Sequence, residues 1–284
     1  MHNFNLRILR AGFTKALQNS LEFTQLANSS FSGEINQKND VVKLLQLGDI
    51  DIGSYVDGTD VTVQSLTDAQ LEIIADQDNY FAYALDTLEF NNNKGGILGE
   101  AARKAAYAAN STIDERFAGL YADGLITDST YTNASPLDMT SLNIEDAMLD
   151  MSERFAEAGV PRSQRKNALV LPWVSTKMAL AGISSKTDNS ALYSTGYIAT
   201  ALGWDFIESN NVSVGTASTG AKTRMMFVVP GESLGFAAAV TAAESTAMEL
   251  QIGKTLVKGR FVHGEKVVRP DMTGVLYADK TAEA

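Results

Sequence analysis

The sequence predicts an α+β fold in which strands and helices are segregated along the chain. Residues 31–86 are rich in β-branched residues between Gly, Asp and Asn breaks, a pattern typical of strands. Residues 97–122 place apolar side chains at three- and four-residue spacing, contain no proline and end at Asp123–Gly124, which predicts one long helix. Shorter helical and strand patterns follow in mixed order, which is typical of α+β rather than of a regular βαβ series.

Residues 31–86 predict a long hairpin. DVVKLLQLGDIDIGSYV and DVTVQSL have strand composition, Asp57–Gly58 predicts a turn, and residues 69–86 form either a further strand pair or one continuous strand. Both faces of the hairpin carry polar residues, so it buries little core of its own and would be marginal alone in water. We therefore expect it to rest on another surface, which a homo-oligomer supplies repeatedly.

Local signals predict the remaining elements. Residues 4–26 carry a modest helical stripe of apolar residues. A second helix begins after the N-cap residue Asn143 and stops at Gly159. NALVLP predicts a buried strand, and a short helix runs from Pro172 through Leu180. Further strands are predicted over 203–212, 223–229 and 248–270.

Composition excludes several classes of function. A chain of 284 residues with 45% hydrophobic residues suits one large domain or two closely joined ones. The absence of cysteine excludes disulfides, zinc–thiolate sites and thiol catalysis. A net charge of −11 repels phosphates, which argues against sequence-specific DNA binding. No segment has the uninterrupted apolar run of about 20 residues that a membrane span needs.

The charges are segregated along the chain. Residues 44–93 contain ten acidic residues and no Lys or Arg, whereas residues 1–21 contain three basic residues and no acid. Residues 254–269 contain five basic residues and one acid. Such segregation indicates contacts between copies of the chain or between domains. A solvated face is the alternative explanation for any single charged residue.

Gly231-Glu232-Ser233-Leu234-Gly235 matches the G-x-S-x-G pattern of a nucleophilic serine. A catalytic triad also needs a histidine and a carboxylate, and His2 and His263 are the only histidines. His263 follows Ser233 after only 29 residues, no βαβ series precedes the serine, and no His-Gly-Gly oxyanion loop is present. The pattern therefore indicates a turn at the end of a strand, with a serine hydrolase as a remote alternative.

Other chemical motifs are incomplete. Gly253-Lys254-Thr255 resembles the end of a phosphate-binding loop, but Met248 stands where that loop needs a glycine. The two histidines lack metal-ligand spacing, and acidic pairs such as Asp49 and Asp51 lack the calcium-loop pattern. The sequence thus predicts no catalytic site, no cofactor and no metal site.

Five segments occur together in the order found in one family. The first is the Gly33-Glu34-Ile35 opening, followed by Tyr55 and the return Asp76-Gln77-Asp78-Asn79-Tyr80-Phe81, and the second is the long helix over 97–122. The third contains Val160-Pro161, Arg165 and Pro172-Trp173, and the fourth is GYIATALGWDFIESNNV. The fifth, near the end, contains Gly259, Gly264, Lys266, Val267 and Pro270. Across nearly the whole chain the sequence resembles the major capsid proteins of tailed bacteriophages with the Hong Kong 97-type fold. The resemblance is to their uncleaved, scaffold-assisted branch.

The resemblance implies a domain organisation. It comprises an N-terminal arm (1–30), an extended loop with its return strand (31–86), a peripheral domain (87–140) with the spine helix, an axial domain (141–222) and closing strands (223–284). It further implies a structural protein, not an enzyme, that self-assembles into hexamers and pentamers of an icosahedral shell around double-stranded phage DNA. Ser233 then lies in a turn and has no catalytic role. An encapsulin, the shell of a cellular nanocompartment, shares the fold and is the main alternative.

The resemblance also implies partners and a location. The partners are further copies of the chain, a separate scaffolding protein, a portal, DNA bound without sequence-specific contact and a possible decoration protein, with no membrane. The location is the virion capsid, assembled in the host cytoplasm. The acid-only stretch can lie over a neighbour's basic surface, and the candidate contacts between subunits are Arg7, Arg10, Lys15, Glu34, Asp49, Asp51, Tyr55, Asp57, Asp60, Asp68, Lys254, Lys258, Arg260 and Lys266.

Overall fold

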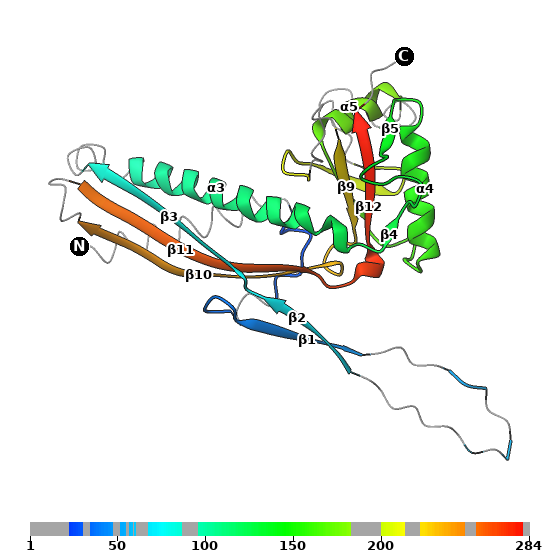
Figure 1. Cartoon of the computed structure of the whole chain (residues 1–284), viewed down its shortest axis with the longest axis horizontal. Coiled ribbons are helices and arrows are strands. Elements are labelled where there is room, and N and C mark those ends of the chain that lie inside the picture. Colours follow the sequence, from blue (N-terminus) through cyan, green and yellow to red (C-terminus); the bar gives the residue numbers. More distant parts are fainter. Residues whose placement is uncertain are drawn as a thin grey trace.

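The chain has three parts in space: a compact unit, a long helix lying on a long sheet, and a hairpin that projects from the sheet (Figure 1). The structure is a computed structural model. It describes residues 23–30, 35–47, 52–54, 57–58, 60, 68–86, 96–182, 200–213, 222–247 and 254–280. The helix expected over 4–26 lies almost wholly outside these residues, and its described part, from Phe23 onward, forms turns.

The long sheet is antiparallel and has the order β10-β11-β3. Its strands are β10 (Leu234–Ala247), β11 (Lys254–Val267) and β3 (Gln77–Asp86). The helix α3 (Gly96–Gly119) runs along one face of this sheet and continues into a 3-10 turn over Leu120–Asp123 (Figure 1). The predicted long helix is thereby confirmed.

An aromatic core joins α3 to the sheet. Phe117 of α3 is fully buried, and its ring centre lies 5.5 Å from that of Phe236 on β10. Phe23, at the start of the described residues, stacks on Phe117 with ring centres 6.5 Å apart. Gly259 of β11 leaves room for the ring of Phe81, which a Cβ at that position would meet at 2.3 Å. The apolar stripe of the helix is thus covered by aromatic side chains of the sheet.

The compact unit is built on a mixed seven-stranded sheet with the order β4-β12-β9-β6-β8-β7, to which β5 is added beside β12. The strands are β4 (Ile126–Thr127), β5 (Leu137–Met139), β6 (Asn167–Val170), β7 (Thr200–Ala201), β8 (Trp204–Glu208), β9 (Thr223–Val228) and β12 (Thr273–Lys280). A 3-10 turn, η3 (Pro270–Met272), leads into β12. Trp204 lies between Phe155 and Phe227, with ring centres 5.1 and 4.8 Å away.

Two helices pack on this sheet as predicted. The helix α4 (Ile144–Glu157) buries Ile144, Met148, Met151 and Phe155, and α5 (Pro172–Leu180) begins at its proline. The prediction of Asn143 as the N-cap residue of α4 is confirmed, although its side chain makes no capping hydrogen bond. Its amide instead accepts a hydrogen bond from the backbone N–H of Thr140 at 2.8 Å and donates one to the carbonyl of Asp138. None of the described helices is long and apolar enough to cross a membrane.

The hairpin consists of β1 (Val41–Leu47) and β2 (Asp68–Ile74), paired antiparallel from Val41 opposite Ile74 to Leu47 opposite Asp68. The predicted turn at Asp57–Gly58 is confirmed by the positive φ of Gly58. Residues 69–86 form two strands in different sheets, because β2 pairs with β1 whereas β3 pairs with β11. A small core at the hairpin base contains Ile35, Val42, Ile73, Ala75, Ala237 and Val262.

Candidate assembly interface

Ser233 is a structural residue of the turn between β9 and β10. Its side chain is fully buried. The hydroxyl accepts a hydrogen bond from the backbone N–H of Val229 at 2.8 Å and donates one to the carbonyl of Met272 at 2.6 Å. Gly231 supplies the positive φ of the turn. The serine therefore ties this turn to the start of β12 and has no hydroxyl proton available for a base.

His263 is too far from Ser233 to act as that base. It pairs with Ala238, five residues along β10 from Ser233, which corresponds to roughly 16 Å of strand. Within the described residues, no group of three or more His, Cys, Asp or Glu side chains is arranged to hold a metal ion. The geometry does not fit the serine-hydrolase alternative.

The hairpin leaves the body at a two-residue break, Ala75–Asp76, between β2 and β3. Ala75 exchanges backbone hydrogen bonds with the start of the hairpin: its N–H donates to Asp40 at 3.0 Å, and its carbonyl accepts from Asn39 at 2.8 Å. The strand crosses so close to β11 that a Cβ on Gly264 would lie 2.2 Å from the carbonyl oxygen of Ile74. The direction of the hairpin is therefore set at this crossing.

Asp40 fixes the other side of the hairpin base. Its carboxylate accepts hydrogen bonds from the backbone N–H groups of Asn36 at 2.8 Å and Gln37 at 2.7 Å. These bonds stabilise the charged form and lower the pKa of Asp40. The following turn places Asn39 at φ 68°, a left-handed conformation that Asn tolerates better than most residues.

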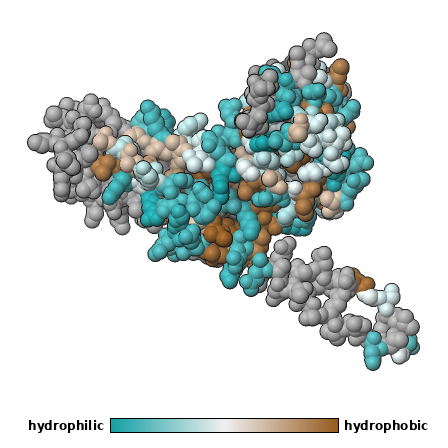
Figure 2. Space-filling view, viewed as in Figure 1, coloured by the Kyte–Doolittle hydropathy of each residue, from teal (hydrophilic) through white to brown (hydrophobic). Residues whose placement is uncertain are grey.

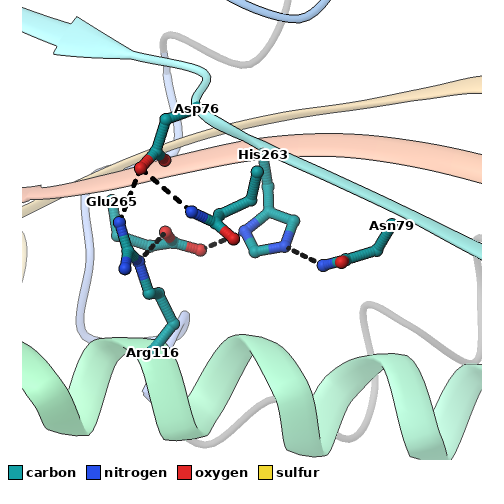
Figure 3. A network of polar contacts seen from close by, with 6 residues as sticks. Asp76, Asn79, Arg116, His263 and Glu265 are labelled. Atoms are coloured by element: carbon teal, nitrogen blue, oxygen red, sulfur yellow. Dashed lines mark hydrogen bonds and ion pairs between the residues drawn. The ribbon is translucent and has the colours of Figure 1, made fainter.

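A polar network connects the hairpin base to α3 and β11 (Figure 3). Arg116 of α3 donates to the carboxylate of Asp76 at 2.7 Å, and Gln77 donates to the same oxygen at 2.9 Å. Behind them, His263 and Glu265 of β11 are buried and contact each other through Nδ1 and Oε1. The amide of Asn79 lies 2.9 Å from Nε2 of His263.

Two of the basic candidate residues contact the acidic stretch of their own chain. Arg260 forms an ion pair with Asp78, with Nε 2.6 Å from Oδ1, and this hydrogen bond lowers the pKa of Asp78 and raises that of Arg260. Lys266 donates to the backbone carbonyl of Glu72 at 3.0 Å. The segregation of charge therefore serves contacts between the hairpin return and β11 within one chain.

The other candidates are distributed over the hairpin and the sheet. Lys258 is exposed on β11, and Asp57 and Asp60 are exposed in the hairpin. Asp68 lies opposite Leu47 at the end of β2, and Lys254 lies opposite Asp86 at the end of β11. The remaining candidates lie outside the described residues: Arg7, Arg10, Lys15, Glu34, Asp49, Asp51 and Tyr55.

Among the described residues, one face of the long sheet carries exposed side chains beyond the hairpin base. Residues opposite each other in antiparallel strands point to the same side, so Tyr80 and Arg260 share a face, as do Ala82 and Lys258. This face is opposite to the one on which Phe81 and Gly259 meet α3. Tyr80 is 81% exposed. We call Tyr80, Ala82, Lys258 and Arg260 the open face.

No protein-family model matches the chain, and no curated protein matches it. Solved structures match it over most of its length. A chain of Mycobacterium phage Che8 has a TM-score of 0.69 and 17% identity, covering 90% of this chain and 91% of its own. A chain from the capsid of cyanophage P-SCSP1u has a TM-score of 0.70 and 16% identity, covering 92% and 89%. The chain has the Hong Kong 97-type capsid fold.

The expected fold is thus confirmed, and the Hong Kong 97-type parts can be recognised. The helix α3 is the spine helix, and β1 with β2 forms the extended loop. A chain from a virus-like particle of Pyrococcus furiosus has a lower TM-score of 0.54 at 13% identity, covering 95% of this chain and 98% of its own. The chains of phage Che8 and cyanophage P-SCSP1u are therefore more similar to this chain in fold than the virus-like particle is.

The structure explains part of the sequence motifs and adds residues that the sequence analysis did not single out. Arg165 of the Val-Pro segment forms an ion pair with Asp205 of β8, which fixes this segment to the sheet. Gly264 is explained by the crossing of the extended loop. Arg116 and Glu265 were not expected, because no local pattern shows that α3, Asp76 and β11 meet at one point.

Proposed function

We propose that this chain is the major capsid protein of a tailed bacteriophage, which assembles into hexamers and pentamers of an icosahedral shell around double-stranded DNA. The observation that carries the proposal is the Hong Kong 97-type fold over about nine-tenths of the chain, found in capsid structures of phages. The projecting hairpin supports it, because its described residues form a core at the base, and a hairpin with a small core is stabilised when a neighbouring copy covers it.

The open face is the surface proposed to receive a neighbour's hairpin. It combines an exposed aromatic ring with Lys258 and with Arg260, which pairs with Asp78 of its own chain. The hairpin brings Asp57 and Asp60 and carries no basic residue between 44 and 93. An exposed ion pair contributes only about 0.2–1 kcal/mol, but a shell repeats each pair many times. Burial of Tyr80 would add apolar contact area.

The division into domains belongs to the same proposal. The core around Trp204 contains residues from Ile126 to Ala278, so strands from the middle and from the last described part of the chain form one compact unit. We propose this unit as the axial domain, and the spine helix with the long sheet as the peripheral domain. The net charge of −11 would limit adhesion of packaged DNA to the shell.

The partners and location follow from the same function. A separate scaffolding protein and a portal would direct assembly in the host cytoplasm, and decoration proteins could bind the finished virion. The chain would need no enzymatic activity. An encapsulin-type shell is the second candidate function, supported by the match to the virus-like particle from Pyrococcus furiosus.

The hairpin offers a direct test. Because Leu47 is paired with Asp68, residues 48–67 can be replaced by a two-residue Asn-Gly turn that closes the hairpin without changing its base. Sedimentation velocity would compare this variant with the wild type under assembly conditions. We expect assembled species in the wild type and their loss in the variant, with unchanged thermal unfolding. Equal assembly of both proteins would contradict the role of the hairpin.

A further inference from the structure

One oxygen of Glu265 lacks a hydrogen bond in a fully buried place. The side chain of Glu265 is 0% exposed, and Oε1 contacts His263. Its Oε2 has no hydrogen-bond partner, and Arg116 Nε lies 3.8 Å away, beyond hydrogen-bond distance. A buried carboxylate oxygen without a donor is costly, so its presence needs a physical explanation.

The nearest cation is bound elsewhere. The guanidinium of Arg116 donates to Asp76 at 2.7 Å, and both side chains are about half exposed. Figure 3 shows Arg116 rising from α3 toward both carboxylates, with a dashed line to Asp76 and another to Glu265. Arg116 is therefore within reach of two acceptors and hydrogen-bonds only one of them.

Apart from this distant ion pair with Arg116, no neighbouring described group donates a hydrogen bond to Oε2 of Glu265. With the Asn79 amide donating to Nε2, a neutral His263 carries its proton on Nδ1 and donates it to Glu265 Oε1. Gln77 donates to Asp76 and not to Glu265. Two carboxylates thus share one guanidinium, and only small motions are needed to move it from one to the other.

The first acceptor lies at the hinge of the hairpin. Asp76 occupies the break between β2, which belongs to the hairpin, and β3, which belongs to the body. A change in the hairpin direction that bends the chain at this break moves Asp76 relative to α3. Glu265 lies within the long strand β11 and stays with the body.

We propose that Arg116 is a two-position latch for the hairpin. Bound to Asp76, it holds the hairpin in the observed direction. When the hairpin turns to engage a neighbour, Asp76 moves away and the guanidinium transfers to Oε2 of Glu265, which then gains its missing donor. The buried acceptor thereby lowers the cost of releasing the hairpin. The latch is a property of the single chain, and only its use during assembly rests on the proposed function.

Hydrogen–deuterium exchange of the unassembled full chain tests the latch. The backbone amides of Asn39 and Ala75 report on the hairpin base, because both are hydrogen-bonded there. We expect Asp76→Asn to speed their exchange roughly 3- to 10-fold, since Arg116 then binds Glu265. We expect Glu265→Gln to slow it, because Asp76 is left as the only charged acceptor. Asp78→Asn, which removes a neighbouring ion pair with Arg260, is the matched control and should leave the exchange of these amides unchanged.

The sign of the Glu265→Gln effect decides between a latch and a merely structural residue. Faster exchange at Asn39 and Ala75, with unchanged exchange in β12, would overturn the proposal. If β12 also exchanges faster, the variant is misfolded and an experimental structure of Asp76→Asn decides instead. A guanidinium within about 3 Å of Glu265 Oε2 would support the latch, and one that stays outside hydrogen-bond distance would overturn it.

The two proposals fail separately. The exchange measurement does not require assembly. If the two variants change the exchange rates as expected but the chain never assembles, the latch is supported and the capsid function is contradicted. If the chain forms shells but the two variants do not change the exchange rates as expected, the capsid function is supported and the latch is contradicted.

Discussion

Gly264 of β11 lies directly against the backbone of Ile74, where the last residue of the hairpin strand crosses the long sheet. A Cβ on Gly264 would come within 2.2 Å of the Ile74 carbonyl oxygen and 2.8 Å of its carbonyl carbon. Backbone atoms cannot rotate away as a flexible side chain can. The close approach explains why glycine occupies this position. Because a side chain at residue 264 would push the hairpin strand away, the direction of the hairpin depends on the absence of a Cβ there.

Replacing Gly264 by Ala should therefore separate the hairpin base from the sheet. We expect a loss of about 1–3 kcal/mol in the free energy of unfolding, as for other overpacked sites, measured by urea denaturation. Gly119→Ala is the matched control, because no atom lies within 4 Å of a Cβ there and the residue ends α3. The control should be neutral or stabilising by up to about 1 kcal/mol. Equal effects of the two substitutions would contradict the crossing.

Ser233→Ala should destabilise the chain without removing any chemistry. The substitution leaves the Val229 N–H and the Met272 carbonyl without their buried partner, which costs about 1–3 kcal/mol of unfolding free energy. Thr112→Ala on the exposed side of α3 is the control and should be close to neutral. Ester hydrolysis by the wild type that disappears in a folded Ser233→Ala variant would revive the hydrolase alternative.

Lys166 makes stability depend on pH in the alkaline range. It is 3% exposed, with its ammonium 5.0 Å from the centre of the Trp204 ring and 3.3 Å from Ser152 Oγ. Burial lowers the pKa of Lys166, and the nearby charge of Arg162 lowers it further. Because the folded-state pKa is lower than the unfolded-state pKa, the unfolded chain binds more protons just below the ordinary value of 10.5. This residue therefore adds stability as the pH rises toward that value.

Lys166→Met isolates this dependence. We expect the stability of the wild type relative to this variant to rise as the pH increases toward 10.5, in urea titrations at several pH values. A pH-independent difference for Lys166→Met would contradict the effect of burial.

The open face predicts a charge dependence of assembly. Lys258→Glu should raise the concentration needed for assembly roughly 2- to 5-fold at low salt, because the neighbour's hairpin is acidic. Added salt should reduce the difference by screening. Lys280→Glu, at the exposed end of β12 in the compact unit, makes the same change of charge away from the open face. Identical assembly of both variants would argue against this surface.

Local signals in the sequence predicted the helices well. The spine helix, α4 and α5 are specified by apolar spacing, glycine stops and the proline at residue 172, all of which act within a few residues. Asn143 was placed correctly at the start of α4, but its amide hydrogen-bonds backward to Thr140 and Asp138. Whether this side chain caps the helix or stabilises the preceding turn depends on the nearby backbone groups of Thr140 and Asp138, which a rule based on the residue type at the helix start does not consider.

Contacts between distant segments could not be predicted in the same way. β3 pairs with β11 across more than 160 residues, from Asp86 opposite Lys254 to Gln77 opposite His263. A strand pattern in the sequence does not indicate which other strand it pairs with. The pair Arg116–Asp76 depends on that pairing and on the position of α3 together. The family resemblance supplied the overall arrangement, whereas the burial of Ser233 and the carboxylates around Arg116 emerged only in three dimensions.

Negative-stain electron microscopy of the purified chain, expressed alone and together with the products of its neighbouring genes, tests the capsid function most directly. We expect closed shells, tubes or isolated hexameric rings. A chain that remains monomeric under both conditions would contradict the account.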